Sequence, residues 1–199
     1  QYRRDREGFI PDGNTHLFVV SANGGAPRQV TSGQWNHSNG RWTPDGKSLL
    51  FSANRIPDWE YSWRQSDIYR VDITSGVVTK LTTRNGPDGN PEPSPDGRYI
   101  AYTGFDSTDA TWQDAALYVM NADGSGVRVL TADLDRSPQG LMWDAQSRGI
   151  YFQAEDRGTR QLYYVTLNGQ RRQLTQGEHM LTLSDLRGGV MVGTRTTPM

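Results

Sequence analysis

The chain has 199 residues, a formal net charge of −1, a sequence pI near 6.3 and no cysteine. The near-neutral charge gives no electrostatic reason to expect nucleic acid or an anionic membrane as a partner. The lack of cysteine excludes disulfides, thiol catalysis and cysteine-based metal sites, and it allows a reducing cytoplasm.

The composition favours an all-β chain. The 22 glycines and 10 prolines supply many turns, and the 6 Trp, 9 Tyr and 5 Phe suit pleated surfaces. No segment shows a convincing helical pattern, and the apolar runs are far too short to span a membrane. We therefore expect short strands joined by tight turns.

The first 34 residues hold only the second half of a structural unit. Two β-forming runs, Leu17–Val20 and Arg28–Thr31, are joined through a glycine turn at Gly24 and Gly25. The opening residues 1–7 are followed by no long apolar core, so we expect no secretory signal there. The beginning of this first unit is expected to be missing or diverged.

Residues 35–86 form a full unit organised around Pro44, Asp45 and Gly46. Proline pre-sets φ for a turn and glycine accepts the left-handed position, so 41–52 is predicted to be strand, turn, strand. The Asp45 side chain is expected to bond nearby backbone amides in the turn. A long loop, 54–65, follows between the second and third strands.

Residues 87–137 repeat this pattern, and residues 138–180 repeat it again in a weaker form. The Pro-Asp-Gly returns 51 residues later at Asp96, with a long middle loop at 104–115. In the next copy, 143–152, it has decayed to Ala145-Gln146-Ser147, and only residues 154–161 stand in the loop position. Residues 181–199 begin one more unit, with its turn at 187–189.

A second pattern that recurs in the units, which we call the Leu-Thr column, is an apolar residue followed by threonine. A run of β-forming residues precedes each copy. The four copies are Val30-Thr31, Leu81-Thr82, Leu130-Thr131 and Leu174-Thr175. Each unit thus holds four strands, and four short strands every ~40–50 residues are typical of propeller blades. We predict a β-propeller of four-stranded antiparallel blades, a fragment of about four blades from a ring of roughly seven.

No catalytic, metal or cofactor site is expected. The nearest match to a Gly-x-Ser-x-Gly elbow surrounds Ser147, but alanine stands in its first place and the segment is the degenerate turn of a repeat. The histidines are scattered without ligand spacing and indicate packing or solvated roles. They are His16, His37 and His179. The segments 106–109 and 133–137 lack a calcium-loop pattern, so turn capping is preferred.

Two long loops carry the candidate functional residues. Large aromatic side chains beside arginine on a loop are what interfaces use as anchors. The candidates for domain docking or gating are Arg55, Trp59, Tyr61, Trp63, Arg64 and Trp112. The alternative is that these side chains pack each loop against its own blade.

The units 41–52 and 92–103, each followed by an Ile/Leu-Tyr strand and a Leu-Thr, resemble the Pro-Asp-Gly propeller repeats of two families. One is the N-terminal β-propeller of prolyl oligopeptidase-family serine peptidases, especially bacterial acylaminoacyl-peptidases; the other is periplasmic TolB. The segments 51–55 with 66–69, 130–137 and 2–20 are similar to the peptidase propeller. The resemblance covers essentially the whole chain.

The resemblance implies a propeller that acts as a lid over a separate α/β-hydrolase domain of the same polypeptide, which carries the Ser-Asp-His triad. The parent protein would then be a serine peptidase that removes acyl-amino acids or short units from peptide substrates, while this chain alone has no activity. It also implies a cytoplasmic location and no cofactor; a homo-oligomer is left open. A TolB-like interaction propeller, which would be periplasmic and non-enzymatic, is the alternative.

Overall fold

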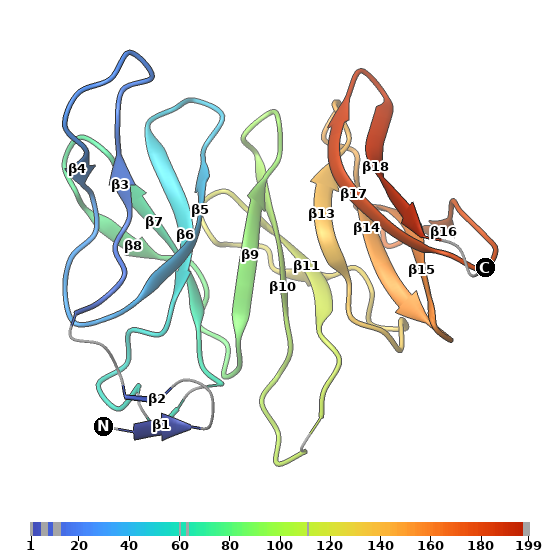
Figure 1. Cartoon of the computed structure of the whole chain (residues 1–199), viewed down its shortest axis with the longest axis horizontal. Coiled ribbons are helices and arrows are strands. Elements are labelled where there is room, and N and C mark those ends of the chain that lie inside the picture. The colour runs from blue at the N-terminus through green and yellow to red at the C-terminus, as the bar shows by residue number, and fades with distance from the viewer. Residues whose placement is uncertain are drawn as a thin grey trace.

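The computed structural model describes residues 2–4, 8–9, 13–59, 61–62, 64–110 and 112–196, the first two ranges by their backbone alone. These residues form strands, turns and bends; they include no helix, and hence none that could cross a membrane. Figure 1 shows their sheets side by side in chain order. The prediction of an all-β chain built from four-stranded antiparallel sheets is confirmed.

Two of the sheets are complete blades, with their strands in sequence order and each strand antiparallel to the next. The first blade contains β5 (His37–Trp42), β6 (Ser48–Ala53), β7 (Asp67–Asp72) and β8 (Val78–Lys80). The second blade contains β9 (Asp88–Pro93), β10 (Tyr99–Gly104), β11 (Ala116–Asn121) and β12 (Arg128–Val129).

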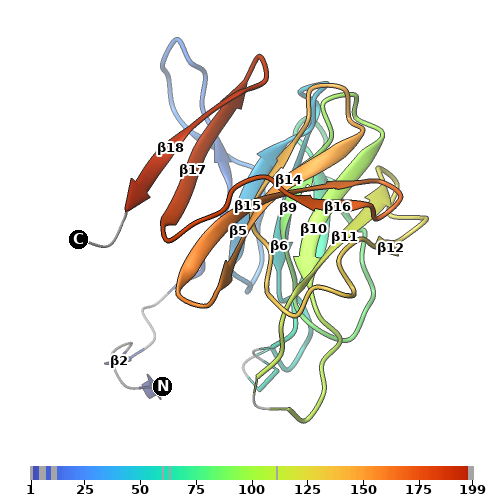
Figure 2. The same ribbon diagram turned by 90° about the vertical axis from the view of Figure 1, so that its right-hand side faces the viewer.

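The chain on either side of these blades forms further sheets. Before them lie two hairpins, formed by β1 (Tyr2–Arg4) with β2 (Gly8–Phe9) and by β3 (Phe18–Val19) with β4 (Arg28–Gln29). After them lies a six-stranded sheet of β13 (Gln139–Trp143), β14 (Gly149–Asp156), β15 (Thr159–Thr166), β16 (Arg171–Gln173), β17 (Met180–Arg187) and β18 (Val190–Thr196). We call β13–β16 the third blade. Figure 2 shows the β17–β18 hairpin to one side of it.

The array has two distinct edges. The turns between the first and second strands of the blades lie along the upper edge of Figure 1, which we call the turn edge. The connections between second and third strands lie along the lower edge, which we call the loop edge. Two of these connections are long, 54–66 and 105–115.

The third connection differs from the expectation of a short loop at 154–161. There, β14 and β15 continue pairing to Asp156 and Thr159, so only two residues form the turn. Arg157 and Gly158 have φ values of 49° and 76°, as a tight hairpin turn requires. The segment is therefore an extended hairpin.

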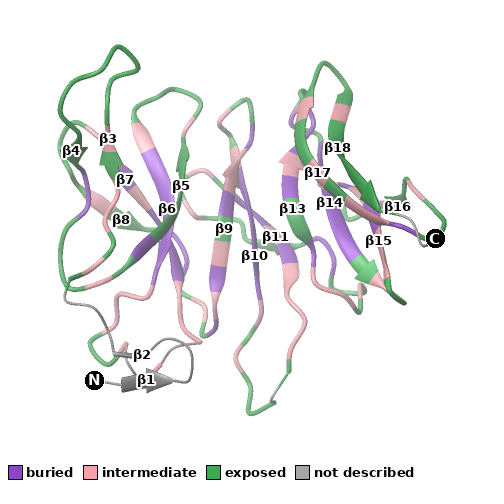
Figure 3. Cartoon of the chain, viewed as in Figure 1, coloured by how far each residue is buried: buried purple, intermediate pink, exposed green. Residues whose placement is uncertain are grey.

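Neighbouring blades pack face to face, and the two-residue period of a strand decides which neighbour each side chain meets. In β6, Leu49 and Phe51 pack with Val30, which follows the β3–β4 hairpin, whereas Leu50 packs with Ile100 and Tyr102 of the second blade. Figure 3 shows the resulting burial along β6 and β10. Since both faces are covered, these central strands are apolar at successive positions.

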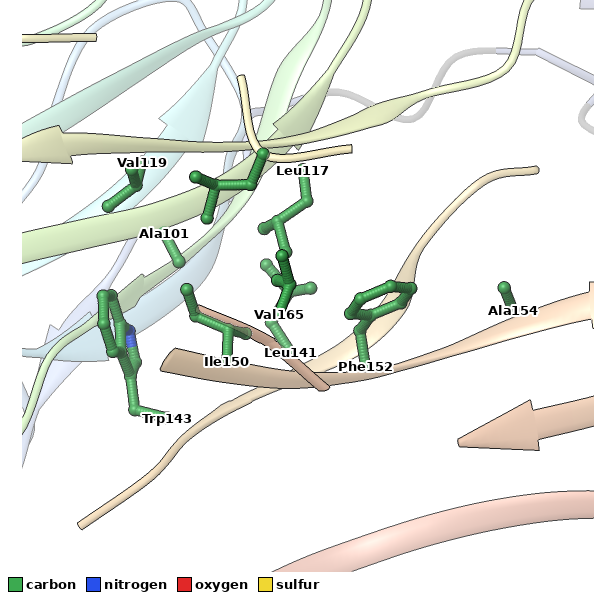
Figure 4. Close-up of a cluster of buried hydrophobic side chains, with 10 residues drawn as sticks. Ala101, Leu117, Val119, Leu141, Trp143, Ile150, Phe152, Ala154 and Val165 are labelled. Atoms are coloured by element: carbon green, nitrogen blue, oxygen red, sulfur yellow. The ribbon is translucent and has the colours of Figure 1, made fainter. Parts of the chain in front are cut away.

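Figure 4 shows the cluster between the second and third blades. Its buried members are Ala101, Leu117, Val119, Leu130, Leu141, Trp143, Ile150, Phe152, Ala154 and Val165. Burying a Leu, Ile, Val or Phe side chain stabilises a fold by about 1.5–3 kcal/mol. The core is thus formed between the sheets, which is why one blade needs the next.

The Leu-Thr column is explained by a hydrogen bond that recurs in all four copies. Each threonine Oγ1 accepts a backbone N–H from a residue in, or directly before, a strand that precedes it in its own unit. The four N–O distances are 2.9 Å, for Leu17 to Thr31, Ile68 to Thr82, Leu117 to Thr131 and Leu162 to Thr175. The threonine therefore fixes the register of the outer strand in every unit.

The expected role of aspartate in the Pro-Asp-Gly turns is confirmed. The Lys47 N–H donates to Asp45 Oδ1 at 3.1 Å, and the Arg98 N–H donates to Asp96 Oδ1 at the same distance. In the third blade Asp144 takes over this role, because its Oδ1 accepts the N–H groups of Gln146 and Arg148 at 3.1 and 2.9 Å. Ser147 there occupies the left-handed glycine position, with φ 57°.

Candidate functional site at the loop edge

The two long loops, whose sequence carries the candidate residues, lie along the loop edge (Figure 1). The side chains of Tyr61 and Trp112, one on each loop, are 82% and 80% exposed, so each presents an uncovered aromatic ring. Trp59 is half-buried, and Trp63 lies outside the described residues. An exposed pair of large aromatics is the feature that a binding surface would use.

The two arginines of the first loop contact other parts of the chain. The Arg55 guanidinium lies over the rings of Trp35 and Tyr69, 4.7 and 5.2 Å from their centroids. Arg64 Nη1 donates to the carbonyl of Ala110 at 2.9 Å and so links the first loop to the second. The structure thus brings the two loops together and gives both arginines a role in holding them.

Each loop is also held by bonds of its own. In the first, Asn54 Nδ2 donates to the carbonyl of Ser62 at 2.8 Å. In the second, Gln113 closes the loop, because its Oε1 accepts the Thr108 N–H at 3.1 Å and its Nε2 donates to the Asp106 carbonyl at 2.6 Å. The exposed aromatics therefore stand on shaped loops.

His37 is the first residue of β5 and is buried, with 1% of its surface exposed. Its Nδ1 lies 3.2 Å from the Thr15 carbonyl, and its ring centroid is 5.2 Å from that of His16. Burial lowers the pKa of His37, and the hydrogen bond to Thr15 opposes this shift. The charges of Arg55 and His16 lower the pKa further. A neutral histidine in this place fits the packing role expected from the sequence.

A second candidate region lies along the innermost strands, where sequence reasoning placed no site. A hollow of about 540 Å³ opens there. Across it Arg41 Nε pairs with Glu92 Oε1 at 3.1 Å, from β5 to β9. Burial raises the pKa of Glu92, and the adjacent Arg41 charge opposes that rise.

The hollow is lined by a β-bulge that recurs in the innermost strand of each blade. Asn39, Asn90 and Gly140 occupy the same place in three strands and have left-handed φ values of 57°, 53° and 61°. Asn90 Nδ2 donates to Thr103 Oγ1 at 3.0 Å. A bulge bends its strand and re-aims the next side chains, here Arg41 and Glu92. The recurrence of Asn at a spacing of 51 residues was the available sequence signal.

The residues considered for chemistry have structural partners. Ser147 is 2% exposed, and its Oγ accepts the Asp96 N–H of the neighbouring blade at 3.2 Å. Asp133 pairs with Arg171 through two bonds of 2.7 and 3.1 Å. Within the described ranges, no three His, Cys, Asp or Glu residues are grouped to hold a metal ion.

The fold and the repeats match known proteins. The PD40 model, described as the TolB beta propeller domain, matches residues 9–178. Dipeptidyl-peptidase 5 of Porphyromonas gingivalis is 31% identical over 174 residues, which are 85% of this chain and 25% of that protein. The chain therefore spans about a quarter of that curated relative.

Solved structures agree on the fold. The crystal structure of a puromycin hydrolase matches with a TM-score of 0.74 and 17% identity, covering 96% of this chain and 34% of that one. The structure of a putative TolB from Agrobacterium tumefaciens matches with a TM-score of 0.63 and 24% identity, covering 83% and 58%. Because the family model matches residues 9–178, the chain belongs to the PD40 family of TolB-type β-propeller domains.

Proposed function

We propose that this chain is the non-catalytic β-propeller part of a serine peptidase and acts as a lid and substrate-size filter over a separate α/β-hydrolase domain. The observation that carries the proposal is the 31% identity to a dipeptidyl-peptidase across 85% of the chain. The puromycin hydrolase match, at lower identity, supports the same architecture. The parent protein would release acyl-amino acids or short units from peptides in the cytoplasm.

The loop edge is the face we assign to the hydrolase domain. Tyr61 and Trp112 are exposed to an extent that a docked surface would cover, and burying an aromatic ring is a common source of interface energy. Arg64 links the two loops, so both rings would move together as a gate closes or opens. Arg55 anchors the start of the first loop on the rings of Trp35 and Tyr69, and Trp59 in the same loop is half-buried.

The experiment compares long and short peptide substrates of the full-length protein. The double variant Tyr61→Ala/Trp112→Ala should raise the kcat/KM for long peptides relative to short ones, since a loosened lid admits larger substrates. Val77→Ala is the matched control, because Val77 is an exposed apolar residue, 61% accessible, in the turn between β7 and β8 and outside both long loops. Equal ratios in a folded double variant and the wild type would refute the lid.

A TolB-like interaction propeller without enzymatic activity is the second candidate, and the family model and the Agrobacterium structure favour it. Such a protein would be periplasmic. The two readings differ in what the gene encodes after residue 199. A hydrolase domain with a Gly-x-Ser-x-Gly elbow would support the peptidase, and its absence from the full gene would support the TolB-like protein.

A further inference from the structure

A buried charge pair lies beneath the loop edge, between the first and second blades. Arg84 lies in the connection from β8 to β9, and its side chain is 19% exposed. Its Nη2 pairs with Oδ1 of Asp88, the first residue of β9, and the Asp88 side chain is fully buried. Two charges removed from water in this way have to be held in a fixed geometry to be tolerated.

The same guanidinium reaches two other elements of the second blade. It lies over the Tyr118 ring of β11, 4.0 Å from the centroid. Its Nε also lies 3.5 Å from Oδ1 of Asp106, near the start of the 105–115 loop. Arg84 thus contacts the inner strand, the third strand and the loop at once.

The backbone beside Arg84 fits closely against the base of that loop. A Cβ placed on Gly86 would come within 2.0 Å of the Phe105 carbonyl oxygen, so only glycine fits there. The Ser107 N–H donates to the Asn85 carbonyl at 2.8 Å. The loop that carries Trp112 therefore starts from a fixed base.

The first loop is tied to the same segment. Gln65 Nε2 donates to the Arg84 carbonyl at 3.1 Å, and Gln65 Oε1 accepts the Gly86 N–H at 2.9 Å. A displacement of residues 84–86 would consequently reach both long loops. The repeat pattern does not predict an arginine at position 84, because the Leu-Thr column of this unit ends at Thr82.

We propose that Arg84 is a positioning residue, whose buried contacts with Asp88, Tyr118 and Asp106 hold the Trp112 loop in the orientation in which the loop edge meets its partner domain. This inference rests on the proposed function for the identity of the partner. The rigidity of the loop is a property of the propeller itself and can be measured separately.

The test uses the full-length protein with Arg84→Met/Asp88→Asn. The double change removes both buried charges at similar volume, which avoids leaving one charge unpaired and keeps the fold. Arg98→Met is the matched control, since Arg98 pairs with Asp96 at the exposed turn edge. The first readout is chymotrypsin cleavage after Phe105 or Trp112, which reports opening of the loop.

We expect cleavage in this loop to rise about tenfold in the double variant and to stay unchanged in the control. The long-to-short peptide ratio should shift in the same direction as in Trp112→Ala. Unchanged loop cleavage in a folded double variant would overturn the positioning role. If cleavage rises while Trp112→Ala leaves the peptide ratio unaltered, the positioning role holds and the lid function fails.

As a second variant, Gly86→Ala tests the base of the loop without touching any charge. Its Cβ would collide with the Phe105 carbonyl, so the loop base has to move. Loop cleavage in Gly86→Ala should rise as in the double variant. A folded Gly86→Ala protein with wild-type loop cleavage would contradict the fixed base on which the proposal depends.

Discussion

Replacing Thr131 by valine should destabilise the blade by an amount that follows from one hydrogen bond. Thr131 is 1% exposed, and its Oγ1 accepts the N–H of Leu117, a residue with no exposed surface, at 2.9 Å. Valine keeps the shape but leaves this buried amide without an acceptor, which costs about 1–3 kcal/mol. For a domain of this size the Tm should fall by about 2–12 °C.

The assay is thermal unfolding of Thr131→Val beside Thr131→Ser, together with hydrogen exchange at the Leu117 amide. Serine retains the oxygen and loses only a methyl group, so it separates the hydrogen bond from the packing. Thr131→Val should be less stable than Thr131→Ser, and its Leu117 amide should exchange faster. Equal stability of the two variants, with the Leu117 amide equally protected, would refute the role assigned to the Leu-Thr column.

Two further changes have defined outcomes. Ser147→Ala removes the bond between Ser147 Oγ and the Asp96 N–H and should lower unfolding stability by about 1 kcal/mol without reducing peptide hydrolysis by the full-length protein; abolished hydrolysis in a folded variant would contradict the structural role. The lowered pKa of His37 means that its stabilising contribution is complete above the unfolded pKa of 6.5 and is lost as the pH falls below it. Unfolding midpoints measured between pH 7.5 and pH 5 should therefore fall less steeply in His37→Gln, and an identical slope in the two proteins would count against this assignment.

The repeat frame could be predicted from sequence because each element carries a local signal. Pro-Asp-Gly specifies a turn, and the Leu-Thr column recurs in every unit. The third copy was found despite the loss of its Pro-Asp-Gly, since the apolar frame around it survives. Asp144 and the left-handed Ser147 show how that turn persists, by moving the capping carboxylate to another position.

Contacts between blades could not be predicted, because they join residues far apart in sequence without a local pattern. Arg28, Arg70 and Arg128 each donate to a carbonyl of the next blade, and nothing in the sequence distinguishes them from other arginines. The same holds for the burial of Arg84. The inner-strand hollow was missed because the recurrence of Asn39 and Asn90 indicates a bulge only once the pairing of their strands is known.

If the propeller acts as a lid, the hydrolase domain covers its loop edge in the full-length protein, and this covering is the most direct consequence to measure. The 199 residues contain no cysteine, so a thiol introduced as Trp112→Cys can be followed by the mass of its labelled peptide. Val77→Cys reports the turn between β7 and β8, which has no assigned partner. The measurement is the rate at which a small thiol reagent labels each position in the folded full-length protein. The account predicts that Trp112→Cys is labelled at least about tenfold more slowly than Val77→Cys, although the propeller alone leaves position 112 open. Equal labelling rates at the two positions would contradict the assignment of the loop edge to a partner domain.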